Sequence, residues 1–251
     1  MNAESTNVIG DNNASRVVEI LLTFASHRTL TAAQITTVTG IPASAVYRHL
    51  TTLVQSGLVT QTKRRGQYSA GAESLRLAAN FRQEAMLKGR ITRQLQLLSD
   101  ETQELAAYLV ISGSEALCLE AVEGPQMLRC SYSPGRSQPL HRGASALALL
   151  AYIGAEERAA VISGLGLDAD ATASLGRELQ LIQGRGFALS YGAVDAGVWG
   201  VSFPVFDHDG HLLGAVSSMA PAGRAVGREK QLIASTRDAA AALAQEGTGP
   251  R

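Results

Sequence analysis

The sequence predicts an α+β protein with two folded parts joined by a helical segment, and three observations support this class. Two short helical patterns separated by a glycine occupy residues 30–57, and about thirty residues with helical spacing follow from residue 72. From residue 105 onward, short apolar or alternating runs are separated by turn residues and interrupted by helical stretches. Helices grouped around an antiparallel sheet define the α+β class.

Length and composition agree with two folded parts and exclude several classes of protein. A chain of 251 residues with 45% apolar residues can form more than one core. Its apolar runs are far shorter than the roughly 20 residues that span a bilayer, and the start MNAESTNVIGDNN lacks the charged and apolar blocks of a secretion signal. We therefore expect a cytoplasmic protein without membrane contact, with a disordered tail over residues 1–13.

Residues with strong positional preferences mark the ends of the first two helices. Thr31 followed by Gln34 fits a capping box at the start of the first helix, and Gly40 can end that helix in the left-handed conformation. Pro42 lies where a second helix can begin. Gly57 then closes that second helix.

The second helix of this pair has two opposed faces. Apolar side chains recur at i, i+4 and i+7, which suits packing against a core: Val46, Leu50 and Leu53. Short hydroxyls, a phenol and a guanidinium form the other stripe: Ser44, Tyr47, Arg48 and Thr51. A helix that docks in the major groove of DNA needs this division between a packing face and a reading face.

A basic hairpin follows the helix pair. LVTQT, KRRG and QYSA read as strand, tight loop and strand, which is the winged variant of the helix-turn-helix, with Lys63, Arg64 and Arg65 at the wing tip. Residues 14–71 hold six basic residues and a single acid, Glu19, whereas the whole chain balances 22 basic against 22 acidic residues. Helix pairs also occur in protein-interaction modules, and a basic loop can be a solvated hairpin. The two-faced helix, the basic loop and the local excess of basic residues together favour DNA binding.

The helical segment after the wing contains two apolar stripes divided by Gly89. The first stripe comprises Leu77, Phe81 and Ala85, and the second comprises Ile91, Leu95 and Leu98. Such a stripe usually packs into a core, but between two folded parts it can also pack against its twin in a dimer. We expect a linker helix over residues 72–88.

The second part is predicted to mix strands and helices. Strands are expected at 105–112, 115–123, 127–132, 187–191, 198–206 and 211–219, and helices at 144–152, 155–163, 172–183 and 227–246. Asp209 and Gly210 supply a hairpin turn between the last two strands. The final helix aligns four small or apolar side chains on one face: Leu232, Thr236, Ala239 and Leu243.

The order of these parts resembles the isocitrate lyase regulator (IclR) family of bacterial transcription factors. The resemblance covers residues 14–245 and rests on GIPASAVYRHLTTLVQSGLV, VEGPQMLR, SPGRSQPLHRGASALALLA, the RGFALSYGAVDAGVWGVSFPVFDHDG run and GAVSSMAP. It implies a winged helix-turn-helix at 14–71, a linker helix at 72–88 and a GAF-like effector-binding domain at 89–251. It also implies a homodimer or homotetramer that represses or activates transcription from a palindromic double-stranded DNA operator.

The resemblance also implies which residues contact DNA. They are Ser44, Ala45, Tyr47, Arg48, Arg64 and Arg65. Where the family often has a lysine and a threonine, this chain has Ala43 and Ala45, so a phosphate contact and a hydroxyl contact can be missing. An alanine methyl can still contact thymine, and we expect an operator that differs from the usual family preference.

The segment PLHRGAS precedes an apolar helix, and free N–H groups at a helix N-terminus favour an anion such as a carboxylate. The resemblance places effector contacts at Ala144, Ser145, Ser190, Gly200, Ser217 and Met219. Gly200 offers no side chain and Met219 stands where relatives have a hydroxyl. We therefore expect a roomier, more apolar pocket for a small organic acid, in which an aromatic acid fits.

An enzyme is the alternative from another class. Cys118, Cys130, His141 and Asp195 could in principle form a Cys-His-Asp site for hydrolysis of a small molecule. The sequence has no nucleophile elbow, phosphate-binding loop or paired metal ligands. We expect no catalytic site, cofactor or metal, two reduced core cysteines, and structural roles for His141 and for Asp195 in a turn.

Overall fold

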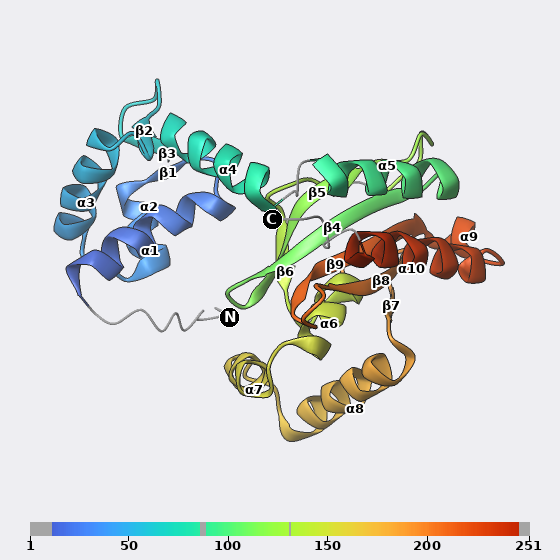
Figure 1. Ribbon diagram of the computed structural model, residues 1–251. Coiled ribbons are helices and arrows are strands. Elements are labelled where there is room, and N and C mark those ends of the chain that lie inside the picture. The colour runs from blue at the N-terminus through green and yellow to red at the C-terminus, as the bar shows by residue number, and fades with distance from the viewer. Residues whose placement is uncertain (1–11, 86–88, 131, 246–251) are drawn as a thin grey trace. The chain divides into compact units, whose positions relative to one another are not determined.

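The structure, a computed structural model, describes residues 12–85, 89–130 and 132–245 (Figure 1). It divides the chain into two compact units, residues 1–85 and 86–251. Most of the expected disordered tail lies outside the described residues. Its last two residues are ordered, because Asn12 caps α1 (Asn13–Ser26) by accepting a hydrogen bond from the backbone N–H of Ser15.

The first unit packs three helices into a small core. The helices are α1, α2 (Ala32–Thr39) and α3 (Ala43–Gln55). The predicted boundaries are confirmed: Thr31 and Gln34 form a reciprocal capping box, Gly40 ends α2 with φ of +70°, and Pro42 is the N-cap of α3. The core contains the predicted apolar face of α3 together with side chains of α1 and α2: Ile20, Phe24, Ile35, Val46, Leu50 and Leu53.

A three-stranded antiparallel sheet completes the first unit. Its strands are β1 (Leu30–Thr31), β2 (Val59–Gln61) and β3 (Gln67–Ala70), in the order β1-β3-β2. The predicted wing is confirmed as the hairpin of β2 and β3. The two-residue β1 was not predicted, because it pairs only with a strand more than thirty residues further along the chain.

Helix α4 (Ala72–Ala85) follows the wing and leaves its apolar side chains exposed. Leu75 is 74% exposed, Leu77 60% and Phe81 49%, so these side chains do not enter the core of the first unit. The backbone N–H of Glu73 donates to the carbonyl of Gly57 at 3.2 Å, which fixes the start of the helix on the turn that follows α3. Its role as a linker stays a prediction.

The second unit is built on a six-stranded antiparallel sheet. The strands are β4 (Leu105–Ser112), β5 (Glu115–Val122), β6 (Ser137–Pro139), β7 (Ala188–Tyr191), β8 (Val198–Phe206) and β9 (Leu212–Pro221), in the order β6-β5-β4-β9-β8-β7. Strands from the start and the end of this unit meet in its middle, where β4 pairs with β9. The α+β class is therefore confirmed.

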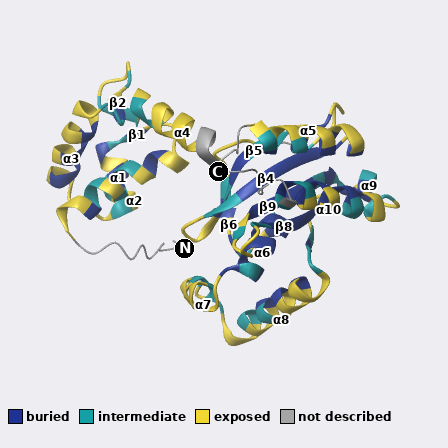
Figure 2. Cartoon of the chain, viewed as in Figure 1, coloured by how far each residue is buried: buried dark blue, intermediate teal, exposed yellow. Residues whose placement is uncertain are grey.

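Helices cover this sheet on two sides (Figure 1). Helices α5 (Arg90–Thr102) and α10 (Glu229–Gln245) pack together against the sheet, and α6 (Gly143–Tyr152) packs between the sheet and α8 (Ala169–Arg185). Helix α7 (Ala155–Gly164) and the short α9 (Ala222–Ala225) complete the unit. The buried sheet and helix faces form its core (Figure 2). The predicted stripe of α5 is buried, as is that of α10.

One predicted strand is wrong. Residues 127–130 are irregular, Ser131 lies outside the described residues, and Met127 and Leu128 are 97% and 75% exposed. Arginine side chains hold this segment instead of a strand ladder: Arg129 pairs with Glu123 at 2.7 Å, and Arg224 donates to the carbonyl of Leu128. The strand that pairs with the outer edge of β5 is instead the short β6, over residues for which the sequence predicts neither strand nor helix.

Within the described ranges, each helix is too short or too polar to cross a lipid bilayer.

Candidate functional sites

Helix α3 presents a polar face to solvent. Ser44, Arg48 and Thr51 are exposed and Tyr47 is 57% exposed, whereas Val46, Leu50 and Leu53 on the other side are at most 2% exposed. Among the residues that the structure describes, the Arg48 guanidinium makes one hydrogen bond, a long and exposed one of 3.4 Å to Asn13 Oδ1. This face can therefore meet a partner without rearrangement of the core.

Ala45 does not lie on that exposed face. It is 8% exposed and packs in the core of the first unit together with Val46 and Leu50. The predicted contact of its methyl group with thymine therefore has no support in the position of the side chain. The buried face of α3 is wider than the predicted stripe, because it includes Ala45 beside Val46.

The wing tip carries three exposed cations. The turn between β2 and β3 is held by its own backbone and by Thr62, whose Oγ1 accepts from the N–H of Arg64 at 3.3 Å. Gly66 has φ of +77°, a conformation that favours glycine at the end of such a turn. Lys63, Arg64 and Arg65 form no ion pair within the described part of the chain, so their charges are available to an anionic partner.

A pocket in the second unit contains every residue that the resemblance assigned to the effector. Its lining includes Ala144, Ser145, Ser190, Gly200, Ser217 and Met219. These residues come from α6, β7, β8 and β9, which lie up to 75 positions apart in the sequence. The space between the lining residues, including open solvent at its mouth, is about 440 Å³.

The N-terminus of α6 forms one wall of this pocket. Gly143, Ala144 and Ser145 make up its first turn and all three line the pocket, while no side chain caps this helix end. N–H groups in the first turn of a helix have no partner within the helix and carry the positive end of its dipole. Gly143 has φ of +82°, and a Cβ at this position would lie 2.9 Å from Cγ2 of Val194, so the backbone approaches the opposite loop closely.

A chain of serine hydroxyls lies next to this helix end. Ser217 Oγ is 2.9 Å from both Ser145 Oγ and Ser202 Oγ, and Ser202 donates to the carbonyl of Val216 at 3.2 Å. Because Ser217 has a single proton, it can donate to only one of its two neighbours at a time. When Ser217 donates to Ser145, the Ser145 hydroxyl keeps its own proton free to donate to a bound acceptor.

The sheet provides the floor of the pocket. Ser190 lies opposite Gly200 across β7 and β8, and Gly200 lies opposite Met219 across β8 and β9. A Cβ at Gly200 would be 3.2 Å from Ser190 Oγ and 3.8 Å from Cβ of Ala144. Glycine at this position therefore keeps space open between the sheet and α6.

Sequence reasoning missed three polar residues of the lining: Tyr132, Gln138 and Asp195. Tyr132 is 5% exposed, its hydroxyl is buried without a hydrogen-bond partner among the described residues, and burial raises its pKa to about 12. Asp195 is predicted only as a turn residue, and it lies in the loop between β7 and β8 at the pocket. No local sequence pattern indicates that Tyr132 lines a pocket. Gln138 directly precedes the segment PLHRGAS, and this position could have indicated a place in the pocket.

The geometry does not favour the hydrolase alternative. Burial and the charge of Glu104 raise the pKa of Cys130 to about 11, so its thiol is protonated at neutral pH and is a poor nucleophile. Cys118 is buried on β5, and its thiol donates to the carbonyl of Glu120 at 3.4 Å. No hydrogen bond joins the His141 side chain to either thiol or to Asp195 in the described ranges, and Nδ1 of His141 is buried without a partner.

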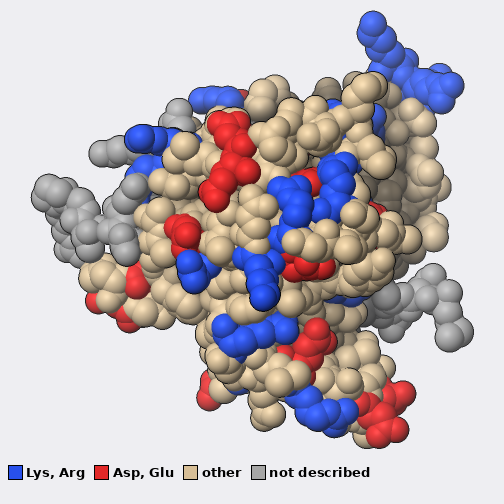
Figure 3. Space-filling view, turned by 90° about the vertical axis from the view of Figure 1, so that its right-hand side faces the viewer, with Lys and Arg blue, Asp and Glu red and all other residues tan. Residues whose placement is uncertain are grey.

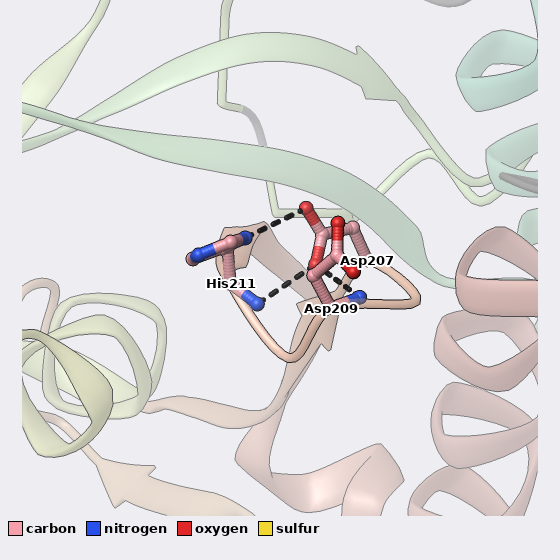
Figure 4. A group of neighbouring side chains, drawn as sticks. All are labelled: Asp207, Asp209 and His211. Carbon is pink, nitrogen blue, oxygen red and sulfur yellow. Dashed lines mark hydrogen bonds and ion pairs between the residues drawn. The ribbon is translucent and has the colours of Figure 1, made fainter.

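Asp207, Asp209 and His211 gather at the hairpin between β8 and β9 (Figure 4). Asp207 Oδ1 accepts from the N–H groups of Asp209 at 3.0 Å and His211 at 2.8 Å, and these bonds lower the pKa of Asp207. An aspartate that binds the backbone two and four residues later stabilises a tight turn. The cluster is therefore explained by the predicted hairpin, without a cation.

On the face shown in Figure 3, basic and acidic side chains lie interspersed. This pattern agrees with the balanced total charge, 22 basic against 22 acidic residues.

Comparison with known proteins identifies the family. A model of the IclR helix-turn-helix domain matches residues 14–63, and a model of the C-terminal part of bacterial IclR transcriptional regulators matches residues 82–245. An HTH-type transcriptional regulator of Mycobacterium tuberculosis is 31% identical over 227 residues, which cover 87% of this chain and 85% of that protein.

Two solved structures share the fold of the chain. A crystal structure of an IclR transcriptional regulator from a Silicibacter species has a TM-score of 0.85 at 25% identity and covers 95% of this chain and 97% of that one. An IclR homologue from Microbacterium hydrocarbonoxydans, complexed with 4-hydroxybenzoate, has a TM-score of 0.72 at 23% identity and covers 94% and 99%. The chain therefore belongs to the IclR family of bacterial transcriptional regulators, with a DNA-binding helix-turn-helix domain and a C-terminal effector-binding domain.

Proposed function

We propose that this regulator binds a palindromic operator as a homodimer or homotetramer and changes its operator affinity when a small carboxylic acid binds in the second unit. The observation that carries the proposal is the pocket itself. Six residues from four separate elements meet at the uncapped N-terminus of α6, beside serine hydroxyls that can donate to an acid.

The DNA contacts are proposed on two elements. On α3, Ser44, Tyr47 and Arg48 offer hydroxyl, phenol and guanidinium groups on an exposed face. On the wing, Arg64 and Arg65 offer charges to phosphates. Such groups can read base edges in the major groove and neutralise the backbone, respectively. A protein with this function works in the cytoplasm of a bacterium, where the chromosome lies.

The oligomer is proposed to form through α4. Its exposed side chains Leu75, Leu77 and Phe81 are large and apolar, and each is about half exposed or more. Exposed apolar side chains that gather on one element are typical of association surfaces. A twofold-symmetric dimer presents two equivalent recognition helices, and its operator must then be a palindrome.

The acid is proposed to place its carboxylate at the first turn of α6 and its body over Gly200 and Met219. The helix end supplies N–H donors and a positive dipole for the carboxylate. The space at Gly200 and the thioether of Met219 suit an apolar body such as an aromatic ring. The 4-hydroxybenzoate bound by the Microbacterium homologue is an acid of this kind.

The regulatory step is a population shift between two arrangements of the DNA-binding domains. A ligand changes operator affinity only by binding the two arrangements unequally, so its effect is limited by that difference. Whether operator binding represses or activates transcription depends on the position of the operator at its promoter.

The proposal is tested in two steps with the full-length protein. Selection from a random double-stranded DNA library should return a sequence with twofold symmetry, which then serves as the operator. Thermal unfolding in the presence of aromatic and short aliphatic acids should identify acids that raise the melting temperature, because selective binding stabilises the folded state. Enrichment of no sequence, or no stabilisation by any carboxylic acid, would contradict the corresponding half of the proposal.

A further inference from the structure

Tyr132 carries a buried hydroxyl group at the pocket. Its side chain is 5% exposed and lines the pocket, yet its hydroxyl is buried and has no hydrogen-bond partner among the described residues. The Arg136 guanidinium lies 5.3 Å from the centre of the Tyr132 ring, which helps to hold the ring in place. Leaving a buried hydroxyl unpaired costs free energy, so a group outside the chain is expected to pair with it.

Gln138 is a second buried polar residue of the lining without a side-chain hydrogen bond in the described ranges. It is 7% exposed, and its Nε2 is 3.3 Å from the point where a Cβ of Gly143 would stand, so its amide lies beside the first turn of α6. The pocket therefore holds donors for a carboxylate at the helix end and, in Tyr132, one further uncharged group that can donate or accept.

The charges around the pocket favour a ligand with a single negative charge. Among the described residues that line it, none is lysine, arginine or histidine, and Asp195 is the one carboxylate. Arg142 lies just before α6, outside the lining, where its guanidinium donates to the carbonyl of Ala193 at 3.0 Å. The helix end thus provides the positive potential inside the pocket, equivalent to roughly half an elementary charge. A second carboxylate on the ligand would be repelled by Asp195, and no cationic side chain among the described lining residues would offset this repulsion.

Resting on the effector site proposed above, we infer that the pocket selects a monocarboxylate that carries an uncharged hydroxyl or oxo group, and that Tyr132 recognises this group. Asp195 disfavours dicarboxylates of similar size. Tyr132 is then a specificity-determining residue, because it distinguishes a hydroxy acid from the parent acid rather than strengthening the binding of acids in general.

The test is isothermal titration calorimetry of the full-length protein with three kinds of probe. The parent acids are benzoate and butyrate, the hydroxy acids are the three monohydroxybenzoates and 3-hydroxybutyrate, and the dicarboxylates are the three benzenedicarboxylates and succinate. Wild type is compared with Tyr132→Phe, Asp195→Asn and the control Tyr152→Phe. Tyr152 ends α6 in an edge-to-face contact with Phe206 and does not line the pocket.

At least one hydroxy acid should bind wild type more tightly than its parent acid. Tyr132→Phe should weaken that hydroxy acid by about tenfold and leave the parent acid unchanged, because one hydrogen bond is removed. Dicarboxylates should bind wild type more weakly than the parent acids and should improve severalfold in Asp195→Asn. Tyr152→Phe should change none of these affinities. Because Tyr132→Phe removes an unpaired hydroxyl, the unliganded variant should unfold at a temperature no lower than wild type.

Two results would overturn the inference while leaving the proposed effector class intact. One is an equal loss of affinity for parent and hydroxy acids in Tyr132→Phe, as expected if a buried water satisfies the hydroxyl. The other is tighter binding of a dicarboxylate than of its parent acid by wild type. Failure of every acid to bind wild type would instead contradict the proposed effector class, and this inference with it.

Discussion

At the scale of single residues, the two proposed functions depend on side chains with opposite surroundings. Tyr47 and Arg48 extend from α3 into solvent, whereas Ser145, Ser217 and Tyr132 are almost completely buried in the second unit. The exposed face of α3 could be predicted because apolar periodicity identifies the side that packs. Tyr132 could not, because only the folded chain shows that its hydroxyl lacks a partner.

Arg48 provides the first prediction at this scale. If its guanidinium reads a base, Arg48→Ala should weaken binding to the selected operator by about 1 to 3 kcal/mol and relax preference at one base pair. Fluorescence anisotropy with the operator and single-base variants measures both effects. Arg177→Ala, an exposed arginine on α8 in the second unit, is the matched control and should change neither quantity. An equal loss on all sequences would assign Arg48 to a phosphate instead.

His49 gives the first unit a pH dependence. It is 2% exposed on α3, and burial lowers its pKa, with smaller contributions from the charges of Arg48 and Arg16. Below about pH 6.5 the unfolded chain binds a proton at His49 that the folded chain does not bind. The contribution of His49 to the free energy of unfolding is therefore fully present above that pH and is lost as the pH falls.

The free energy of unfolding should therefore decrease from pH 7 to pH 5 with a contribution from His49 of at most about 1.4 kcal/mol per pH unit. Thermal unfolding followed by circular dichroism at several pH values measures the slope, which should be shallower in His49→Gln. Thr52→Ser, at an exposed position of the same helix that carries no titratable group, should leave it unchanged. Equal slopes in His49→Gln and wild type would contradict the assignment.

At the scale of elements, local sequence signals predicted most helices and hairpins. They did not predict short strands whose pairing partners lie far away in the sequence. Residues 198–206 were predicted as a strand and form β8 with those bounds, because a turn sequence and two apolar runs are adjacent in the chain. The short strands β1 and β6 depend on partners elsewhere in the chain. Residues 127–132 show the opposite error, since an apolar run was held in an irregular path by Arg129 and Arg224.

The wing is predicted to contribute charge rather than sequence preference. Removing both guanidinium groups in the double variant Arg64→Ala, Arg65→Ala should reduce the slope of log affinity against log salt by about 0.9 for each phosphate that the variant no longer neutralises. Preference for the operator over a scrambled duplex should remain. Titrations over a range of salt concentrations measure the slope. An unchanged slope would mean that the wing does not contact phosphates.

Helix α4 is predicted to associate with its twin. Leu77→Glu combined with Phe81→Glu should place charges in the interface and shift the protein toward monomer, because unpaired charges are costly to bury. Sedimentation velocity measures the assembly, and Leu181→Glu, at a 67% exposed leucine of α8, serves as the control. An unaltered assembly in the double variant would place the interface elsewhere.

At the scale of the whole molecule, the chain joins a DNA-binding unit to an effector-binding unit. The order of its motifs was enough to indicate the family, because both units carry sequence features with a fixed spacing. The six pocket residues came from that resemblance, and the structure brings them together at α6. Their local sequences alone could not have placed them together, because residues as distant as Ala144 and Met219 meet only when α6 packs on β8 and β9.

The central claim is that occupancy of the pocket changes operator affinity. It is tested most directly by fluorescence anisotropy of the selected operator, with and without a saturating acid chosen by thermal unfolding. Wild type is compared with Gly200→Val, whose side chain would fill the space between Ser190 and Ala144, and with Gly176→Val, where a Cβ meets no neighbour within 4 Å.

The acid should change the operator affinity of wild type and Gly176→Val by about 5- to 150-fold, the usual range of coupling between two sites. It should leave the affinity of Gly200→Val unchanged, while that variant still binds the operator without the acid. An acid that binds wild type in the calorimeter yet leaves operator affinity unchanged would contradict the account.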